Sequence, residues 1–175
     1  MSVTFKSPML ETERLILRGP MARDADQFIS FYGSERSHMA GGPRDPREAW
    51  TNLAADFGHW AIRGFGMFTV TYKDDDTALG VVGHYYPHTR PEREIGWVLF
   101  DPNLEGRGIA HEAAKACVDY AWDVLNWKTA VSYIDPRNAR SIKLAERLGA
   151  TLDEDAPTPA HVERCIVYRH PRPKQ

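Results

Sequence analysis

The sequence has few cysteines, no long apolar run and no excess of charge of one sign. Its two cysteines, Cys117 and Cys165, are too few for the disulfide framework of a small secreted domain. The longest apolar run, 95–100, is far shorter than the roughly 20 residues of a membrane-spanning helix. Lys and Arg number 22 against 24 Asp and Glu, a formal net charge of −2. The chain as a whole therefore has no attraction for nucleic acid or acidic lipid.

The chain also lacks internal repeats, low-complexity tracts and any linker long enough to divide it. Residues 1–8 have neither the charged start nor the long apolar stretch of a signal peptide, so we expect a cytoplasmic protein. With 42% apolar and 26% charged residues, the composition is that of an ordinary globular protein rather than a disordered, collagen-like or coiled-coil chain. A length of 175 residues predicts a single domain over 1–175.

The spacing of apolar residues, interrupted by Gly and Pro clusters, predicts the elements of secondary structure. Strands are expected over 14–18, 65–72, 78–86, 94–100 and 129–134, with a final pair at 150–154 and 162–169. Helices are expected over 22–32, 46–61, 108–125 and 139–148. Pro46 suits a first helical position, Gly149 suits a helix end, and Asp74–Asp76 is expected as a hairpin turn.

In chain order these elements read β-α-α-β-β-β-α-β-α-β-β, which predicts an α/β fold with a mixed, mostly antiparallel sheet and about four helices. The strands at 65–72, 78–86 and 94–100 are expected as an antiparallel meander. The helix between strands 94–100 and 129–134 is expected to make one right-handed parallel crossover.

The segment 101–111, where a strand ends and a helix begins, carries the clearest chemical signal. Gly106 and Gly108 lie in the short loop between the two elements, where glycine lets the backbone turn tightly and approach a ligand. The first N–H groups of a helix have no internal partner, and the helix dipole favours negative charge there. The segment predicts a site for a phosphate or pyrophosphate, and the alternative is a tight turn without a ligand.

The spacing argues against two common phosphate-binding loops. The segment is not Gly-x-x-x-x-Gly-Lys-Ser/Thr, so a P-loop nucleotidase is not indicated. His111 stands where the third glycine of Gly-x-Gly-x-x-Gly would be, and the preceding strands form a meander, which weakens a dinucleotide-binding fold. A nucleotide-binding protein of dinucleotide type stays an alternative, and it predicts binding of NAD or ATP.

The segment 105–110, Glu-Gly-Arg-Gly-Ile-Ala, resembles the Gln/Arg-x-x-Gly-x-Gly/Ala motif of the GCN5-related N-acetyltransferases, the GNAT family. The tract 111–113, His-Glu-Ala, is similar to the Thr-Glu-Ala that often follows this motif. Other segments resemble the family's opening strand (11–18), the link into its second helix (41–50), its central hairpin (64–68 and 79–83) and its second cofactor motif (138–141 and 146–150). Together they resemble the ribosomal-protein-alanine N-acetyltransferase branch.

This resemblance implies an N-acetyltransferase domain that uses acetyl-CoA as its cosubstrate and moves the acetyl group to a primary amine by direct attack in a ternary complex. It implies that loop N–H groups bind the pyrophosphate and that a strand opened by a bulge binds the pantetheine arm. The cofactor-binding residues that it implies are Val98, Leu99, Phe100, Gly106, Arg107, Gly108, Ile109, Ala110, His111, Asn138 and Ser141. Glu105 departs from the motif, which has Gln or Arg at this place.

Two residues are expected to be catalytic. Glu94 is the preferred general base, because it begins the strand that leads into the cofactor loop and can face the cleft near the thioester. The alternative is a solvated carboxylate at a strand end, paired with Arg90 or Arg93. The resemblance places Ser141 as a hydrogen-bond donor to the cofactor sulfur, since the tyrosine acid of many relatives is absent and Ala145 lies near its place.

Other residues stay open as the base. His84 is the main rival, because an ordinary imidazole has a pKa near 6.5, although a histidine within an apolar strand is more often structural. Glu154 and Glu163 near the C-terminal strands are further candidates. No residues have the spacing of a zinc motif, so no metal is expected.

The acceptor amine is expected to enter opposite the cofactor, between the first two helices, the loop 33–44 and the C-terminal hairpin. This loop carries charges of both signs, so a protein N-terminus, an amino sugar, an aminoglycoside-like drug and a polyamine all stay open. A non-catalytic acyl-CoA-binding sensor or scaffold of the same fold is the second hypothesis. No nucleic-acid or membrane partner is expected, and a homodimer through the C-terminal strands is compatible with the sequence.

Overall fold

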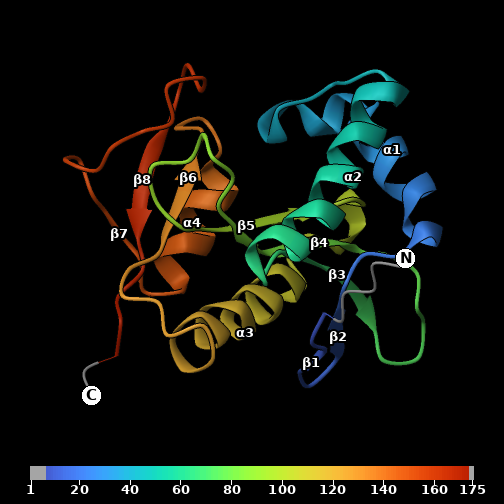
Figure 1. Ribbon diagram of the computed structural model, residues 1–175, viewed down its shortest axis with the longest axis horizontal. Coiled ribbons are helices and arrows are strands. Elements are labelled where there is room, and N and C mark those ends of the chain that lie inside the picture. The colour runs from blue at the N-terminus through green and yellow to red at the C-terminus, as the bar shows by residue number, and fades with distance from the viewer. Residues whose placement is uncertain (1–6, 174–175) are drawn as a thin grey trace.

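The computed structural model describes residues 7–173, which form one mixed sheet with helices on both of its faces (Figure 1). Residues 1–6, on which the expected lack of a signal peptide mainly rests, lie outside this part. The strands are β1 (Leu10–Glu11), β2 (Leu15–Arg18), β3 (Met67–Tyr72), β4 (Gly80–Tyr85), β5 (Glu94–Leu99), β6 (Val131–Ile134), β7 (Thr151–Leu152) and β8 (Ile166–Arg169). The sheet has the order β1-β2-β3-β4-β5-β6-β8-β7, which confirms the predicted α/β fold class.

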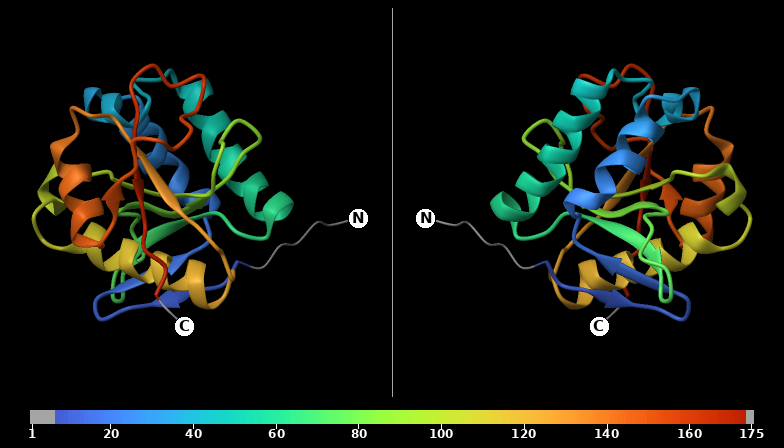
Figure 2. Two further views of the ribbon diagram at one scale, coloured as in Figure 1. Left: turned by 90° about the vertical axis from the view of Figure 1, so that its left-hand side faces the viewer. Right: turned by 90° about the vertical axis from the view of Figure 1, so that its right-hand side faces the viewer.

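The described residues 7–173 also form four α-helices and three short 3-10 helices. They are η1 (Ala22–Asp24), α1 (Ala25–Tyr32), η2 (Glu35–Ala40), α2 (Pro46–Arg63), η3 (Pro102–Leu104), α3 (Ile109–Asp123) and α4 (Ala139–Arg147). α2 begins where the sequence predicts, because the Asp45 carboxylate accepts the Glu48 N–H at 2.9 Å and Pro46 fills the first turn. α1 and α2 lie on one side of the sheet and α3 on the other (Figure 2).

The expected meander and the expected crossover are both confirmed. β3, β4 and β5 pair antiparallel, and β6 returns parallel to β5 after the crossing helix α3. β1 was not expected, because two residues are too short to show a period. The final strand pair is also shorter than predicted, since β7 and β8 flank a long loop over 153–165.

The sheet opens between β5 and β6. These strands pair only at their start, where Glu94 lies opposite Val131. β4 stays paired along all of β5, from Tyr85 opposite Glu94 to Gly80 opposite Leu99, without a break in register. The expected bulge in β5 is therefore wrong: the strand edge is exposed because β5 leaves β6, not because an extra residue interrupts β5.

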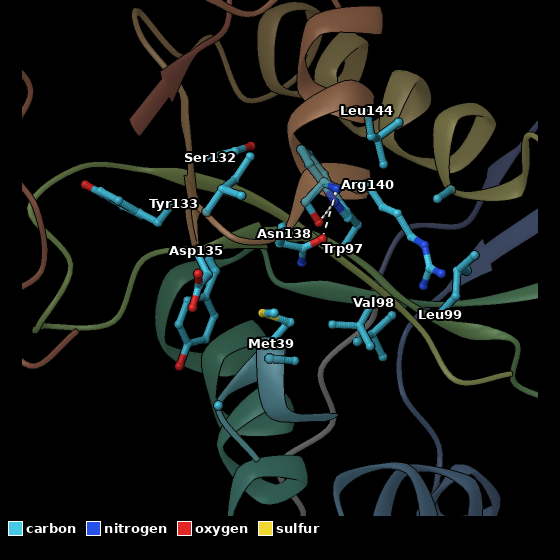
Figure 3. Close-up of a pocket in the computed structure, with 18 of the residues that line it drawn as sticks. Met39, Trp97, Val98, Leu99, Ser132, Tyr133, Asp135, Asn138, Arg140 and Leu144 are labelled. Carbon is cyan, nitrogen blue, oxygen red and sulfur yellow. Dashed lines mark hydrogen bonds between the residues drawn. The ribbon is translucent and has the colours of Figure 1, made fainter. Parts of the chain in front are cut away.

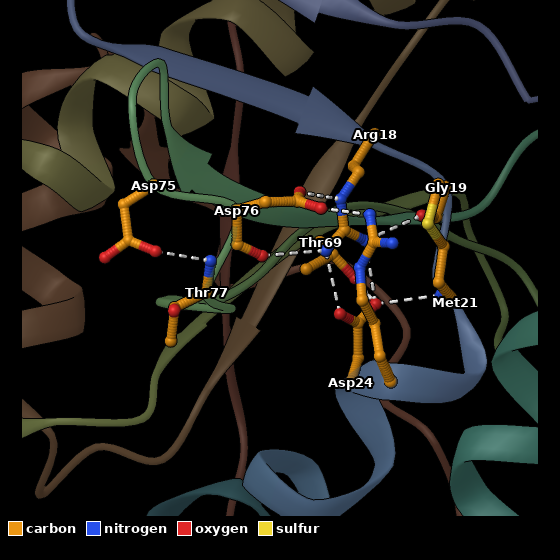
Figure 4. Close-up of polar contacts among 9 residues, drawn as sticks. Arg18, Gly19, Met21, Asp24, Thr69, Asp75, Asp76 and Thr77 are labelled. Atoms are coloured by element: carbon orange, nitrogen blue, oxygen red, sulfur yellow. Dashed lines mark hydrogen bonds and ion pairs between the residues drawn. The ribbon is translucent and has the colours of Figure 1, made fainter.

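A buried ion pair fixes α1 against the sheet (Figure 4). The Arg18 guanidinium at the end of β2 donates to both oxygens of Asp24 at 2.8 Å and to Asp76 at 2.7 Å. Thr69 of β3 donates a further hydrogen bond to Asp24 at 3.0 Å. Since Arg18 and Asp24 are both buried, removal of Arg18 leaves the Asp24 carboxylate without its cation, at a cost of about 3–5 kcal/mol.

Candidate functional site

A cleft of about 1610 Å³ occupies the opening between β5 and β6. Its walls come from both halves of the molecule: Met39 from η2, Val98 and Leu99 from β5, Ser132 from β6 and Leu144 from α4 (Figure 3). Small-molecule pockets usually enclose about 300–1,000 Å³, so this cleft has room for more than one ligand.

The loop before α3 forms one end of the cleft. Gly106 and Gly108 have φ values of 73° and 78°, in the left-handed region that favours glycine. The backbone N–H groups from Gly106 to His111 donate to no acceptor within residues 7–173. They lie at the N-terminus of the 15-residue helix α3, where free N–H groups and the helix dipole together suit an anion.

The start of α3 is fastened to the turn between β1 and β2. The Glu112 carboxylate accepts the Thr12 hydroxyl at 2.6 Å, the Arg14 N–H at 2.8 Å and the Arg14 Nε–H at 2.7 Å. Arg14 also donates from Nη1 to the Arg107 carbonyl at 2.9 Å. Burial acts to raise the pKa of Glu112, but the hydrogen bonds from Thr12 and Arg14 outweigh it and lower that pKa.

Glu105, the departure from the resembled motif, lies between two arginines. Its carboxylate accepts from Arg36 of η2 at 2.6 Å and pairs with Arg140 of α4 at 2.7 Å. Both guanidiniums thus neutralise the carboxylate beside the free N–H groups. The carboxylate is not directed to solvent alone, and it joins the two walls of the cleft.

The exposed edge of β5 presents alternate backbone groups to the cleft. In an antiparallel pair, successive residues direct their N–H and C=O groups alternately toward and away from the partner strand. The Phe100 N–H donates to the Leu79 carbonyl at 2.9 Å, so Val98 directs its groups to β4, while Trp97 and Leu99 face the opening. Of the three β5 residues implied by the resemblance, Leu99 thus presents its backbone to the opening. Trp97 was missed, because the sequence does not give the register.

Glu94 is buried at the narrow end of the opening, with 8% of its surface exposed. Its carboxylate lies 2.9 Å from Arg90 Nε, and Oε2 has no hydrogen-bond partner within residues 7–173. The alternative of a solvated carboxylate is therefore wrong, although the pairing with Arg90 is present. Burial raises the pKa of Glu94 to about 7, against the opposing effect of the Arg90 charge.

The three rival bases differ in position. Tyr85 of β4 lies directly opposite Glu94 of β5, so these two side chains point to the same face of the sheet. His84 is the next residue along β4, so its side chain points to the opposite face. There it is fully buried against α3, with Nε2 2.9 Å from the Cys117 carbonyl, and burial lowers its pKa to about 4. Glu163 lines the cleft as an exposed residue, whereas Glu154 is exposed and does not line it.

Asn138 and Ser141 lie together at the start of α4. The Asn138 side chain accepts the Ser141 N–H at 3.1 Å, which is the N-cap contact expected for this residue type. The Ser141 hydroxyl oxygen accepts the Trp97 Nε1–H at 3.2 Å. Because the oxygen is the acceptor in this contact, the hydroxyl hydrogen stays available to donate into the cleft, which both residues line.

The sequence also gave no signal for Asp56. This α2 residue lines the cleft near Tyr32 and Tyr85, and burial raises the pKa of its carboxyl to about 7. A single Asp within an amphipathic helix reads as a solvated residue, so only the packing of α2 against the cleft identifies it.

Across residues 7–173, no group of three or more His, Cys, Asp or Glu side chains is placed to hold a metal ion. None of the helices in this part of the chain combines the length and apolar composition that crossing a bilayer requires.

Comparison with known proteins identifies relatives over most of the chain. Residues 14–151 match the family model described as an acetyltransferase (GNAT) domain. The chain is 41% identical over 151 residues to the uncharacterized protein YkkB of Bacillus subtilis (strain 168), covering 80% of this chain and 83% of that protein.

Solved structures share the fold. The crystal structure of an acetyltransferase from Agrobacterium tumefaciens str. C58 has a TM-score of 0.90 and 37% identity, covering 98% of this chain and 99% of that one. The microcin C7 self immunity acetyltransferase MccE, solved in complex with acetyl-CoA and AMP, has a TM-score of 0.68 at 17% identity, over 90% of this chain and 92% of its own.

Proposed function

This chain belongs to the GNAT acetyltransferase family and is an acyltransferase, and from that premise we propose that it moves the acetyl group of acetyl-CoA to a primary amine. The observation that carries the proposal is the row of free N–H groups from Gly106 to His111 beside the exposed edge of β5. A fold relative holds acetyl-CoA, which supports the same cosubstrate here.

The residues present fit this cosubstrate. The free N–H groups at the start of α3 suit a pyrophosphate, and the left-handed Gly106 and Gly108 let the backbone come close to it. The backbone of Trp97 and the Leu99 N–H offer unpaired strand groups to the amides of a pantetheine arm, while the Leu99 carbonyl accepts from Arg36 at 3.1 Å. Asn138 and Ser141 lie on the opposite wall of the same cleft.

Acetyl-CoA, when bound, supplies a thioester whose acetyl carbon forms a C–N bond with the amine as its C–S bond breaks, the thiolate leaving with a proton from the amine. The acceptor must first lose an ammonium proton, and we expect Glu94 to take it, since Glu94 lines the cleft and burial raises its pKa to about 7. We expect the Ser141 hydroxyl to donate a hydrogen bond to the leaving sulfur without losing its proton, while Trp97 donates to the serine oxygen at 3.2 Å.

The mechanism of transfer, the acceptor, the cellular location and the oligomeric state stay predictions. The resemblance implies direct attack in a ternary complex, and a cleft with room for two ligands supports this proposal. The resemblance to the ribosomal-protein-alanine branch favours a protein N-terminus as one acceptor. The cytoplasmic location and the homodimer are likewise proposals from the sequence.

A ligand-dependent melting experiment tests the cosubstrate. A ligand that binds only the folded state raises its stability by about 2.7 kcal/mol at a hundredfold excess over Kd. We expect acetyl-CoA and desulfo-coenzyme A to raise the Tm, and NADH and ATP to leave it unchanged. An equal shift with NADH would instead support the dinucleotide-binding alternative.

Turnover is then followed as amine-dependent release of the CoA thiol. We expect release when a primary amine is added and none without it. Binding of acetyl-CoA without release for any primary amine would support the acyl-CoA sensor and contradict the proposed transferase activity.

A further inference from the structure

Asp56 is the half-buried carboxylate of the cleft that lacks a partner. Its side chain lines the cleft from α2 and makes no hydrogen bond or ion pair with any residue in the range 7–173. Other cleft carboxylates are compensated by arginine: Glu94 by Arg90, and Glu105 by Arg36 and Arg140. Glu163 has no such pair either, but it is exposed to water.

An unpaired carboxylate that has lost part of its contact with water is less stable in its charged form. Burial is the cause that raises the pKa of Asp56 to about 7. A ligand that brought a positive charge to this position would restore the solvation that the carboxylate has lost, through a charge-assisted hydrogen bond.

Asp56 and Glu94 lie on the same side of the sheet. Tyr85 is directly opposite Glu94 in the β4–β5 register, so both side chains point to the face covered by α1 and α2. Asp56, Tyr85 and Glu94 line the same cleft, and the charges of both carboxylates add to the effect of burial in raising the pKa of Tyr85. The Tyr32 ring of α1 is also near Asp56.

We propose that the acceptor is a small diamine, with one ammonium group bound by Asp56 while the other amine reaches Glu94. The inference rests on the proposed acetyl transfer and assigns its acceptor class. Asp56 binds the distal end of the acceptor and takes no part in the chemical step, so it determines specificity. Tyr32 and Tyr85 line the space between with aromatic rings, which suit both methylene groups and cations.

Two arginines also line the cleft, and they could favour an acceptor with a negatively charged distal group. Arg90 is engaged by Glu94 and lies over the rings of Tyr85 and Tyr133, at 5.7 and 5.2 Å from their centres. Arg44 lines the cleft, and its buried Nε has no hydrogen-bond partner within residues 7–173. If Arg44 recognised the acceptor, the distal group would be a carboxylate rather than an ammonium.

Three amines of matched length separate these cases: butane-1,4-diamine, butylamine and 4-aminobutyrate. They carry a positive, a neutral and a negative distal group. For the wild-type protein we expect kcat/KM for the diamine to exceed that for each of the others by roughly tenfold or more. Equal values for the diamine and butylamine, or a preference for 4-aminobutyrate, would overturn the proposal.

Variants of Asp56 test whether this residue causes the preference for the diamine over butylamine. Asp56→Asn is expected to bring the diamine-to-butylamine ratio of kcat/KM to about one, and Asp56→Glu, which keeps the charge, to retain a ratio above one. Asp123→Asn removes an exposed charge outside the cleft and is the matched control, with the wild-type ratio. A wild-type ratio in Asp56→Asn, or a ratio of one in Asp56→Glu, would overturn the role of Asp56.

Binding gives a readout that does not need turnover. In a calorimetric titration of the CoA-bound protein, butane-1,4-diamine is expected to bind Asp56→Asn at least about tenfold more weakly than wild type. Equal affinities would contradict the proposal. Acetylation of all three amines without preference removes the diamine inference alone, whereas acetylation of no primary amine removes the proposed transferase activity with it.

Discussion

At Glu94, burial and a nearby guanidinium act on one carboxylate in opposite directions. Burial is the larger effect and raises the pKa to about 7, while Arg90 at 2.9 Å lowers it. The folded protein therefore holds this proton more tightly than the unfolded chain. The resulting stabilisation is complete below pH 4.5, the ordinary value of the group, and is lost as the pH rises through about 7.

Glu94→Gln removes this ionisation without a large change in shape. We expect kcat/KM to fall roughly 100-fold, because general-base catalysis typically contributes about 10²–10⁴. The wild-type pH profile should rise with an apparent pKa near 7, and the variant should lose this rise. Steady-state kinetics between pH 5.5 and 9, with acetyl-CoA affinity measured separately, check the prediction.

Glu163→Gln is the control for Glu94→Gln, since it neutralises an exposed carboxylate on the same cleft. Its pH profile should match that of the wild-type protein. If Glu94→Gln kept the rise near pH 7, another group would be the base.

At the scale of elements, one carboxylate fastens the start of α3 to the turn before β2, in addition to the apolar face that the helix buries in the core. Glu112 accepts hydrogen bonds from Thr12 and from both the backbone and side chain of Arg14, and Arg14 in turn holds the Arg107 carbonyl. The contact joins Thr12 and Glu112, which are 100 positions apart in the chain. It aligns the free N–H groups with the cleft through the turn before β2.

Glu112→Gln should destabilise the fold and loosen the loop. Loss of charged hydrogen bonds costs about 1–3 kcal/mol, so we expect the Tm to fall by several degrees and the Kd for acetyl-CoA to rise several-fold. Because the folded-state pKa of Glu112 is lowered, its stabilisation is present above the ordinary value of 4.5 and is lost as the pH falls. Thermal melts at pH 7 and pH 4 measure both effects.

Asp119→Asn is the matched change on the same helix. It breaks an exposed pair with Lys115, and such surface pairs contribute about 0–1 kcal/mol. A Tm loss as large as that of Glu112→Gln would show that any lost charge on α3 has the same effect, against a specific role for Glu112.

Local patterns in the sequence predicted the elements, but not how far two strands stay paired. The start of α2 at Pro46 and the glycines of the anion loop have local causes, so the periodicity and residue types were enough. The separation of β5 from β6 depends on packing between distant parts, including Trp97 of β5 against the cluster that contains Ile134 and Ala145. For that reason the sequence did not predict that the backbone of Trp97 faces the opening, and it predicted a bulge in β5 that is absent.

Which of the candidate bases faces the cleft also depends on the fold and not on local sequence. His84 and Glu94 are both polar residues in apolar strands, and composition cannot tell which face each occupies. The β4–β5 register directs Glu94 toward the cleft and His84 toward α3. Asp56 had no local signal at all, because its significance comes from what the folded chain fails to place beside it.

At the scale of the whole molecule, Glu105 connects the two halves that border the cleft. Arg36 belongs to the side built by α1 and α2, and Arg140 belongs to the side of α4. Arg36 also donates to the Leu99 and Phe100 carbonyls at 3.1 Å, across the edge of β5 that an extended ligand would follow. The same carboxylate thus neutralises two cations next to the anion site and holds one of them over the strand.

Glu105→Gln should therefore bind acetyl-CoA more tightly, because it releases two guanidiniums toward the ligand's phosphates while the free N–H groups of the loop are unchanged. We expect the Kd to fall roughly threefold to tenfold and its dependence on salt to become steeper, since more positive charge then faces the ligand. Calorimetric titrations at low and high salt measure both. Asp135→Asn, which breaks the pair with Arg137 at another part of the cleft, is the control. Weaker binding by Glu105→Gln would show the opposite balance: the carboxylate would then matter more for joining the two walls than for shielding the arginines from phosphate.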